Sequence, residues 1–292
     1  MKSRQEVRAL AAESIRAHRS TAILLGFMFV LLTAVSIGLD EVAWRAAGEW
    51  AYWIVFTIGT IFLSVLGVNM AGEYLKVFMR ERASVRALFT GLKVNFFRKL
   101  GGMLWMTLWV AIWASPWVIV LSYLFAGFTE GLIDGNAFAG SVFLTLPLLT
   151  PAIIKGLSYY MMTYILASAS EVKALESMRL SKRMTKGHKG KLFPLFLCFF
   201  GWTLLTILPA GFLSDLGAGL VESGSAAIGI LLIVLGYLLS GLVFILFLGP
   251  YMYTSLAGFF LELRDNAIET GKITPEEFGI EVEDDFSFEA EA

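Results

Sequence analysis

Residues 226–248 read AAIGILLIVLGYLLSGLVFILFL, an apolar run without a charged side chain. The hydrocarbon core of a bilayer is about 30 Å thick, and a helix that rises about 1.5 Å per residue needs roughly 20 apolar residues to cross it. Backbone groups in lipid must bond within their own segment, which a helix allows. The run therefore predicts a membrane-spanning helix.

Stretches upstream of this run have the same character, and the whole chain is 57% hydrophobic and 16% charged with a mean hydropathy of +0.73. Such a chain is too apolar for an ordinary soluble domain. The period-two alternation of a membrane β-barrel is missing. We therefore predict an all-α, polytopic bundle of about six spans, near Thr21–Leu39, Ala51–Gly72, Gly101–Phe125, Ser141–Ser168, Leu192–Leu213 and Ala226–Leu248.

Basic residues gather in the N-terminal arm and in the second and fourth connections between spans. Because Lys and Arg mark cytoplasmic loops, these segments and both termini are expected in the cytoplasm. The long basic region before the first span favours a retained helix over a cleaved signal peptide. The basic residues are Lys2, Arg4, Arg8, Arg16 and Arg19, then Arg80, Arg82, Arg86, Lys93, Arg98 and Lys99, then Lys173, Arg179, Lys182, Arg183, Lys186, Lys189 and Lys191. The other connections hold Asp40, Glu41, Glu49, Glu130, Asp134, Asp215 and Glu222, with Arg45 as their single basic residue.

Each basic segment shows helical periodicity before a span. In residues 1–19, Ser3 and Glu6 form a possible capping box ahead of an apolar face that includes Val7. Ser84 is a plausible N-cap for a second helix with an apolar stripe. In the third segment, Ser170 precedes an apolar face. The second stripe is Val85, Leu88, Phe89, Leu92 and Phe96, and the third is Val172, Leu175 and Met178.

Two interpretations of these three amphipathic helices stay open. They either bind anionic lipid headgroups at the membrane surface, or they serve only as topology determinants and connectors. The candidate interfacial basic residues are Arg86, Lys93, Arg179, Lys182, Arg183, Lys186 and Lys189.

The even-numbered spans end alike, because a glycine recurs at Gly67, Gly156 and Gly249 before a small or aromatic segment. Together with the basic helices, this pattern suggests three units, each a basic helix followed by a hairpin of two spans.

The last segment, residues 264–292, carries ten acidic and two basic residues and has few apolar ones. Disorder is the default for such a composition. Alternating apolar residues still leave open a strand on a protein partner or docking onto the basic loops. They are Phe278, Ile280, Val282, Phe286 and Phe288. The chain thus divides into a basic helix (1–19), a transmembrane domain (20–263) and an acidic tail (264–292).

Lys155 is a charge within a predicted span and therefore a candidate functional residue. Counting from Ser168 at about 1.5 Å per residue puts it roughly 20 Å from the cytoplasmic boundary. Pro147 and Pro151 are expected to interrupt the helix before it. The alternatives are a cavity-facing ammonium, snorkelling, or an ion pair with Glu130 or Asp134.

Three further residues are candidates with simpler explanations. Glu73 lies three residues before Lys76, which favours a local ion pair. Tyr159 and Tyr160 lie near the end of the fourth span, where belt positions and helix contacts are typical of tyrosine.

Enzyme signatures are missing from the sequence. His18 and His188 are the only histidines, and both lie in basic segments. No Gly-rich phosphate loop follows a strand, and no pair of intramembrane carboxylates occurs. We therefore expect no catalytic residue, cofactor, metal or nucleic-acid partner.

The later part of the chain resembles a known family. Residues 174–184 read ALESMRLSKRM, followed by Lys186-Gly187-His188-Lys189, Phe200-Gly201-Trp202 and Gly249-Pro250-Tyr251. Upstream, Pro151-Ala152-Ile153-Ile154-Lys155 precedes Ser158-Tyr159. These segments are similar to those of the DUF975 (domain of unknown function) membrane proteins, although Ala152 stands where that family has glycine. The resemblance covers about Gly67–Leu263 and implies a polytopic protein of the bacterial cytoplasmic membrane with no established activity.

Two functional hypotheses follow. The first is a non-enzymatic membrane protein that acts by associating with anionic lipid, or with a protein partner through its acidic tail. The second is a small-molecule or lipid transporter that uses Lys155 in a Pro-interrupted helix.

Overall fold

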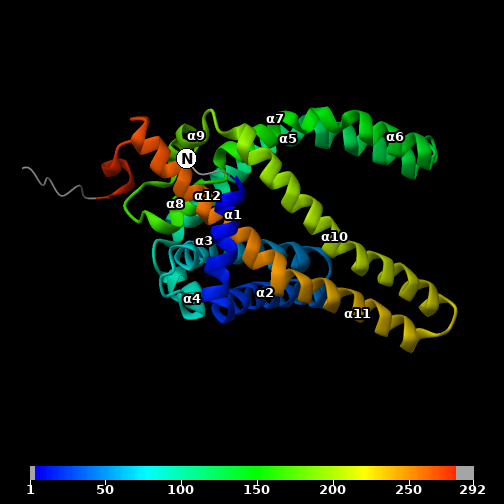
Figure 1. Ribbon diagram of the computed structural model, residues 1–292. Coiled ribbons are helices and arrows are strands. Elements are labelled where there is room, and N and C mark those ends of the chain that lie inside the picture. The colour runs from blue at the N-terminus through cyan, green and yellow to red at the C-terminus, as the bar shows by residue number, and fades with distance from the viewer. Residues whose placement is uncertain (1–3, 281–292) are drawn as a thin grey trace, which may run out of the picture. The chain divides into compact units, whose positions relative to one another are not determined.

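The computed structural model describes residues 4–280, and every regular element within that range is a helix (Figure 1). Six helical segments are long and apolar enough to cross a membrane. The predicted helical bundle is confirmed to that extent. The six segments are Arg19–Ala47, Glu49–Met79, Phe96–Thr129, Gly135–Ser168, Lys189–Glu222 and Ala226–Glu269.

The chain folds as two compact units. Within the described residues, unit one comprises residues 4–100 and Gly190–Leu263, and unit two comprises Gly101–Lys189 and residues 264–280. Unit one contains α1 (Arg4–Ala17), α2 (Arg19–Ala47), α3 (Glu49–Met79), α4 (Val85–Lys93), the first residues of α5 (Phe96–Thr129), most of α10 (Lys189–Glu222), α11 (Ala226–Val243), the π-helix η2 (Phe244–Leu248) and most of α12 (Gly249–Glu269). Unit two contains the rest of α5, then α6 (Gly135–Thr145), the 3₁₀ segment η1 (Leu146–Leu149), α7 (Thr150–Tyr159), α8 (Met162–Ser168), α9 (Ala174–Thr185) and the 3₁₀ segment η3 (Pro275–Phe278).

The core of unit one lies where α2, α3 and α4 meet. Its fully buried side chains include Leu25, Met70 and Leu88. Tyr74 donates from its hydroxyl to the carbonyl oxygen of Ala22 at 2.8 Å, which bonds α3 to α2. A buried hydroxyl needs such an acceptor to offset its lost hydration.

The helix α3 is longer than the predicted span Ala51–Gly72, because it continues to Met79. Its 31 residues extend roughly 46 Å at about 1.5 Å per residue, more than the hydrocarbon core of about 30 Å. Nearly all its buried residues lie in the C-terminal half, from Val65 to Val77. The helix therefore has one half with exposed apolar side chains and one half buried in protein.

In unit two, the fourth span is interrupted as its prolines predict. The helix α6 ends at Thr145, and Pro147 is the second residue of the 3₁₀ segment η1, which leads into α7. A second interruption, at Tyr160 and Met161 between α7 and α8, was not expected. The side chains of α8 are almost all buried, so this end of the predicted span packs in protein.

The prediction of a disordered tail is wrong for residues 264–280. The helix α12 continues to Glu269, and η3 follows with Phe278 buried. Ala267 and Ile273 are also buried, which means that a few apolar residues suffice to order this acidic segment. Residues 281–292, with Val282, Phe286 and Phe288, lie outside the described residues.

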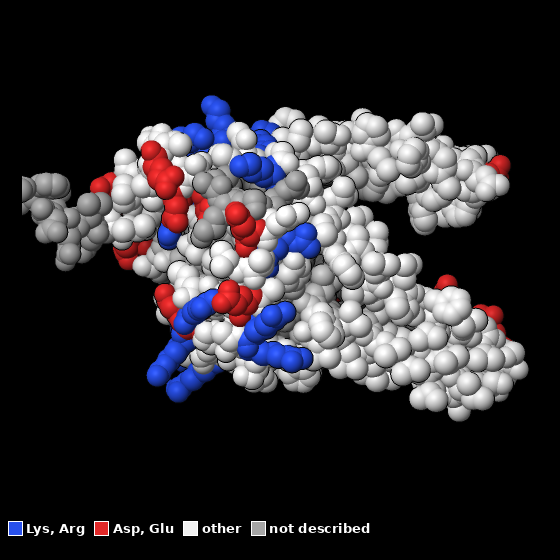
Figure 2. Space-filling model, viewed as in Figure 1, with Lys and Arg blue, Asp and Glu red and all other residues white. Residues whose placement is uncertain are grey.

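Charged atoms are segregated along the helices (Figure 2). The long helices show few Lys, Arg, Asp or Glu atoms on the drawn face. Blue atoms gather around α1 and α4 in unit one and around α9 in unit two, and only red atoms are visible at the far end of α6 and at the turn between α10 and α11. This distribution fits apolar helices in lipid with charged residues at their ends.

Candidate functional site

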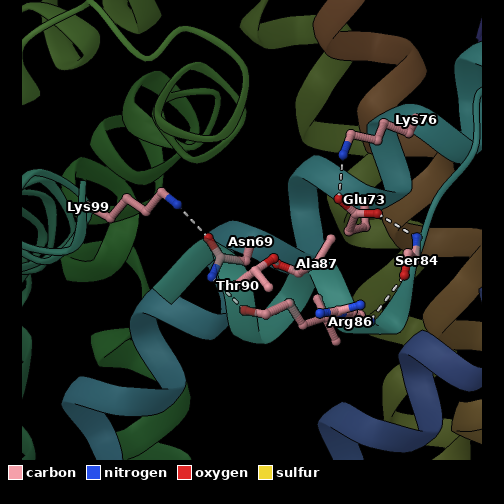
Figure 3. Close-up of polar contacts among 9 residues, drawn as sticks. Asn69, Glu73, Lys76, Ser84, Arg86, Ala87, Thr90 and Lys99 are labelled. Carbon is pink, nitrogen blue, oxygen red and sulfur yellow. Dashed lines mark hydrogen bonds and ion pairs between the residues drawn. The ribbon is translucent and has the colours of Figure 1, made fainter. Parts of the chain in front are cut away.

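Asn69 bonds three helices of unit one to one another (Figure 3). Its amide nitrogen donates to the carbonyl oxygen of Leu88 in α4 at 2.9 Å, and its Oδ1 accepts from Nζ of Lys99 in α5 at 2.7 Å. Lys99 donates also to the carbonyl oxygen of Gly91 at 2.9 Å and is only 7% exposed. A Cβ at Gly91 would lie 2.8 Å from Cγ of Asn69, so glycine allows this close approach. The cluster therefore fixes α4 against α3 and the start of α5.

Glu73 is a structural residue of the same region (Figure 3). One carboxylate oxygen accepts from Nζ of Lys76 at 2.6 Å, which confirms the predicted ion pair, and the other accepts from the backbone N–H of Ser84 at 2.7 Å. Ser84 in turn caps α4, as predicted, because its hydroxyl accepts from the N–H of Arg86 at 3.2 Å. Both carboxylate oxygens of Glu73 are thus engaged within the protein.

Each of the three basic helices forms a hydrogen bond with a residue of an even-numbered span. In each case that residue lies two positions after one of the recurring glycines. After Gly67, Asn69 bonds α4 as described above. After Gly156, the carbonyl oxygen of Ser158 accepts from the hydroxyl of Ser181 in α9 at 2.8 Å.

After Gly249, the hydroxyl of Tyr251 accepts from Nε of Arg8 in α1 at 2.5 Å. The element order also repeats, since each basic helix precedes two spans. This common attachment position favours the three-unit organisation that the sequence suggests.

Part of the apolar faces of α1 and α4 packs on the protein. Val7 and Ala11 of α1 are buried, and a Cβ on Gly258 of α12 would lie 2.9 Å from Cγ1 of Val7. Leu88 of α4 is fully buried in the core of unit one. These three side chains therefore contact protein and are not available to lipid. The Ser3 of the predicted capping box lies outside the described residues.

The predicted apolar face of the third basic helix is correct only in part. Val172 is buried and Met178 is half-buried, but Leu175 is 51% exposed. Ser177 and Ser181 of α9 are instead fully buried. Ser181 and Thr185 donate to carbonyl oxygens, so small polar side chains can form the buried face. Exposed residues of the basic helices include Arg86, Lys93, Arg179, Lys182, Arg183 and Lys186.

Arg183 holds the tail segment within unit two. Its guanidinium bonds both carboxylate oxygens of Glu277, at 2.6 and 3.0 Å, and donates to the carbonyl oxygen of Lys272. Glu277 also accepts from the N–H of Thr274 at 3.0 Å and thereby caps η3. The donated hydrogen bonds from Arg183 lower the pKa of the Glu277 carboxyl. The ordered acidic segment therefore binds α9, the docking that the sequence left open.

Lys155 belongs to a group of three lysines in unit two. Its Nζ lies over the ring of Trp113 in α5, 4.9 Å from the centroid. Lys189, at the start of α10, lies close enough to Lys155 and Lys182 to experience their charges. Lys182 and Lys189 lie on either side of the α9–α10 turn, and the depth of Lys155 in the bilayer stays a prediction.

The residues after Lys155 pack in protein, because the side chains of α8 are almost all buried and the carbonyl oxygen of Ser158 accepts from the hydroxyl of Ser181 in α9. Within residues 4–280, Lys155 forms no ion pair with Glu130 or Asp134. Asp134 instead caps α6 by accepting from the N–H of Ala137 at 2.8 Å.

Tyr159 and Tyr160 lie one turn beyond Lys155 in the same unit. Tyr159 is 4% exposed, which indicates a helix contact and excludes a belt position for it. Tyr160 is half-buried beside Tyr164, with ring centroids 6.5 Å apart. The aromatic neighbour of the Lys155 ammonium is Trp113.

The structure gathers Lys155, Lys182 and Lys189 in unit two, whereas Glu73, Arg86 and Lys93 belong to unit one. Sequence reasoning missed Asn69, Lys99 and Trp113. Asn69 had one usable signal, because it is a lone amide in an apolar run two residues after a recurring glycine.

A family model described as a protein of unknown function, DUF975, matches residues 1–267. No curated protein and no solved structure matches the chain. The match includes all or most of each of the six candidate spans. The description of the family assigns no activity.

Proposed function

Because the chain belongs to the DUF975 family, whose description assigns no activity, we propose from its own residues that it is a non-enzymatic membrane protein that binds anionic phospholipids at its basic end. The basic segments then face the cytoplasm, with both termini, and the bilayer is the bacterial cytoplasmic membrane. The charge distribution between the spans and the family resemblance support this location.

The observation that carries the proposal is the way in which the basic helices are held. Leu88 of α4 and Leu180 of α9 are buried, while Arg86, Lys93, Arg179 and Lys182 on the same helices are exposed. Fixed helices at the ends of membrane spans present their charges at headgroup level. Each basic residue near an anionic surface contributes about 1 kcal/mol of attraction.

The test compares two lipids. Full-length protein in dodecyl maltoside micelles is titrated with dihexanoyl phosphatidylglycerol or dihexanoyl phosphatidylcholine, and bound lipid is measured by native mass spectrometry. We expect tighter binding of phosphatidylglycerol and a weakening of that preference with salt.

The matched variants are Arg86→Gln, Lys93→Gln and Arg179→Gln combined, and Arg45→Gln at the opposite helix ends. At about 1 kcal/mol per charge, the triple variant should lose phosphatidylglycerol affinity by roughly 100-fold, whereas Arg45→Gln should not change it. Equal affinity of the unmodified chain for the two lipids would contradict the proposal.

A second candidate function is lipid translocation, favoured by the 3₁₀ interruption at Leu146–Leu149 and the half-buried Lys155 that follows it. Proteoliposomes with fluorescent phosphatidylglycerol in both leaflets should then lose all fluorescence to external dithionite. With the Lys155→Ala variant, dithionite should remove only the fluorescence of the outer leaflet, about half of the total. Protection of the inner leaflet by the unmodified protein would dismiss this function.

A further inference from the structure

We propose that Lys155, Lys182 and Lys189 form one binding site for a phosphate group, carried by an anionic lipid headgroup or by a free phosphate. This inference rests on the proposed function, because it names one place where the chain binds the anionic headgroup. The contacts within unit two explain how three residues far apart in the sequence form this site.

Two features of the fold bring the three lysines together. Ser158 of α7 accepts from the hydroxyl of Ser181 at 2.8 Å, and these residues lie close in sequence to Lys155 and Lys182. The turn from α9 to α10 then passes through Gly187, whose φ of +87° suits glycine. The N–H of His188 bonds the carbonyl oxygen of Thr185 at 3.0 Å and closes this turn, which places Lys189 at the start of α10.

Within the described part of the chain, no carboxylate is paired with this group of lysines. Among residues 4–280, none of the three ammonium groups forms an ion pair with a carboxylate. Glu277, which contacts α9, is bound to Arg183. Like charges held near one another repel, and the repulsion is relieved when an anion binds among them.

The neighbours of the group favour a phosphate at a membrane surface. Trp113 lies against the Lys155 ammonium at 4.9 Å, and a cation–π contact of this kind orients the ammonium without neutralising it. Lysine ammonium groups bind phosphate as point charges through several N–H donors. Basic pockets between membrane helices are typical sites for phospholipid headgroups.

Arg183 is excluded from the site although it follows Lys182 directly. Its guanidinium is occupied by Glu277 and the carbonyl oxygen of Lys272. Lys173, at the other end of α9, is exposed and provides a matched control for the loss of one positive charge from this helix.

The experiment uses the full-length chain in dodecyl maltoside micelles, with dihexanoyl phosphatidylglycerol as the probe and native mass spectrometry as the measurement. Lys155→Gln, Lys182→Gln and Lys189→Gln should each weaken binding about fivefold. Lys173→Gln should change it less than about twofold, and Lys155→Arg should bind like the unmodified chain because it keeps the charge and the cation–π contact.

A competition arm identifies the source of the phosphate. Displacement of the lipid by inorganic phosphate at millimolar concentration indicates a site for phosphate groups in general. Failure of inorganic phosphate to compete, with the lysine dependence intact, indicates a site that requires the lipid. Thermal unfolding of each variant verifies that it is folded. If Lys155→Gln does not fold, the phosphatidylglycerol affinities of Lys182→Gln and Lys189→Gln test the site.

Two outcomes separate this inference from the proposed function. If the three lysine variants bind phosphatidylglycerol like Lys173→Gln, while the Arg86, Lys93 and Arg179 triple variant loses it, this site is refuted and the proposed function stands. If the unmodified chain does not prefer phosphatidylglycerol to phosphatidylcholine, both are refuted.

Discussion

At Asn69, one amide side chain satisfies two groups that are otherwise costly to bury, the carbonyl oxygen of Leu88 and the ammonium of Lys99. Lys99 is bonded to neutral oxygens and not to a carboxylate. The stabilisation of its buried charge therefore depends on how well those oxygens are aligned with the ammonium. A change of one residue should therefore affect three helices.

Asn69→Ala should lower the free energy of unfolding by about 2–3 kcal/mol, since it removes a hydrogen bond to a buried charge and leaves a carbonyl unpaired. Ser64→Ala is the control, because the Ser64 hydroxyl donates only to Thr60 of its own helix. Equilibrium unfolding in mixed micelles measures the free energy of unfolding of both variants. Equal stabilities of the two variants would show that the Asn69 contacts contribute little.

The contact between Arg183 and Glu277 should respond to pH. Its hydrogen bonds hold the pKa of Glu277 below the ordinary 4.5, so the stabilisation is present above that value and lost as the pH falls through the lowered pKa. Both side chains are partly exposed, which limits the effect to less than about 1 kcal/mol.

A spin label at Ile280→Cys, in a Cys198→Ala background, reports the attachment of this segment. Its mobility should rise between pH 7 and a pH below about 4. Glu277→Gln should be mobile throughout, and Glu276→Gln should keep the pH response. A label that stays immobile at low pH would argue against the contact as the attachment.

Among the elements, the attachment of α1 depends on a glycine. A Cβ at Gly258 would lie 2.6 Å from Cζ of Phe78 and 2.9 Å from Cγ1 of Val7. Gly258→Ala should therefore lower the free energy of unfolding by about 1–3 kcal/mol. At Gly67, where an added Cβ meets nothing within 4 Å, alanine should instead stabilise α3 by about 0.5–1 kcal/mol. Differential scanning calorimetry compares the two, and a stable Gly258→Ala would refute the close packing.

The existence of the spans was predictable, because apolar runs of sufficient length have few alternatives. The ends of the spans were not predictable from the sequence. In α3, the apolar residues from Val65 onward look like part of a membrane segment, but most of them are buried in protein. Part of the face of α9 was misassigned because Ser181 and Thr185 bury hydroxyls by donating to carbonyl oxygens, which an apolar stripe does not reveal.

The candidate site was predictable in its central residue only. Lys155 stands out as a charge in an apolar run, whereas Lys182 and Lys189 resemble ordinary loop charges. Their association depends on the tertiary contact between α7 and α9, in which Ser181 donates to the carbonyl oxygen of Ser158. No local pattern in the sequence marks that contact.

For the whole molecule, the proposed orientation places both termini and the basic connections in the cytoplasm. In a Cys198→Ala background, a cysteine at Lys186 should react with a membrane-impermeant maleimide only after the cells are opened. A cysteine at Glu130 or Ser223 should react in intact cells, because these residues lie in the opposite connections. Labelling of position 186 from outside would reverse the orientation.

The buried half of α3 has a consequence for membranes of different thickness. A helix can usually adjust to a thicker bilayer by sliding or tilting until its apolar length matches the lipid. Here sliding would carry Asn69 and Glu73 into hydrocarbon and break the bonds to Lys99 and Ser84. We therefore expect the lipid to deform around this protein, so that bilayers built from longer acyl chains become thinner at its perimeter.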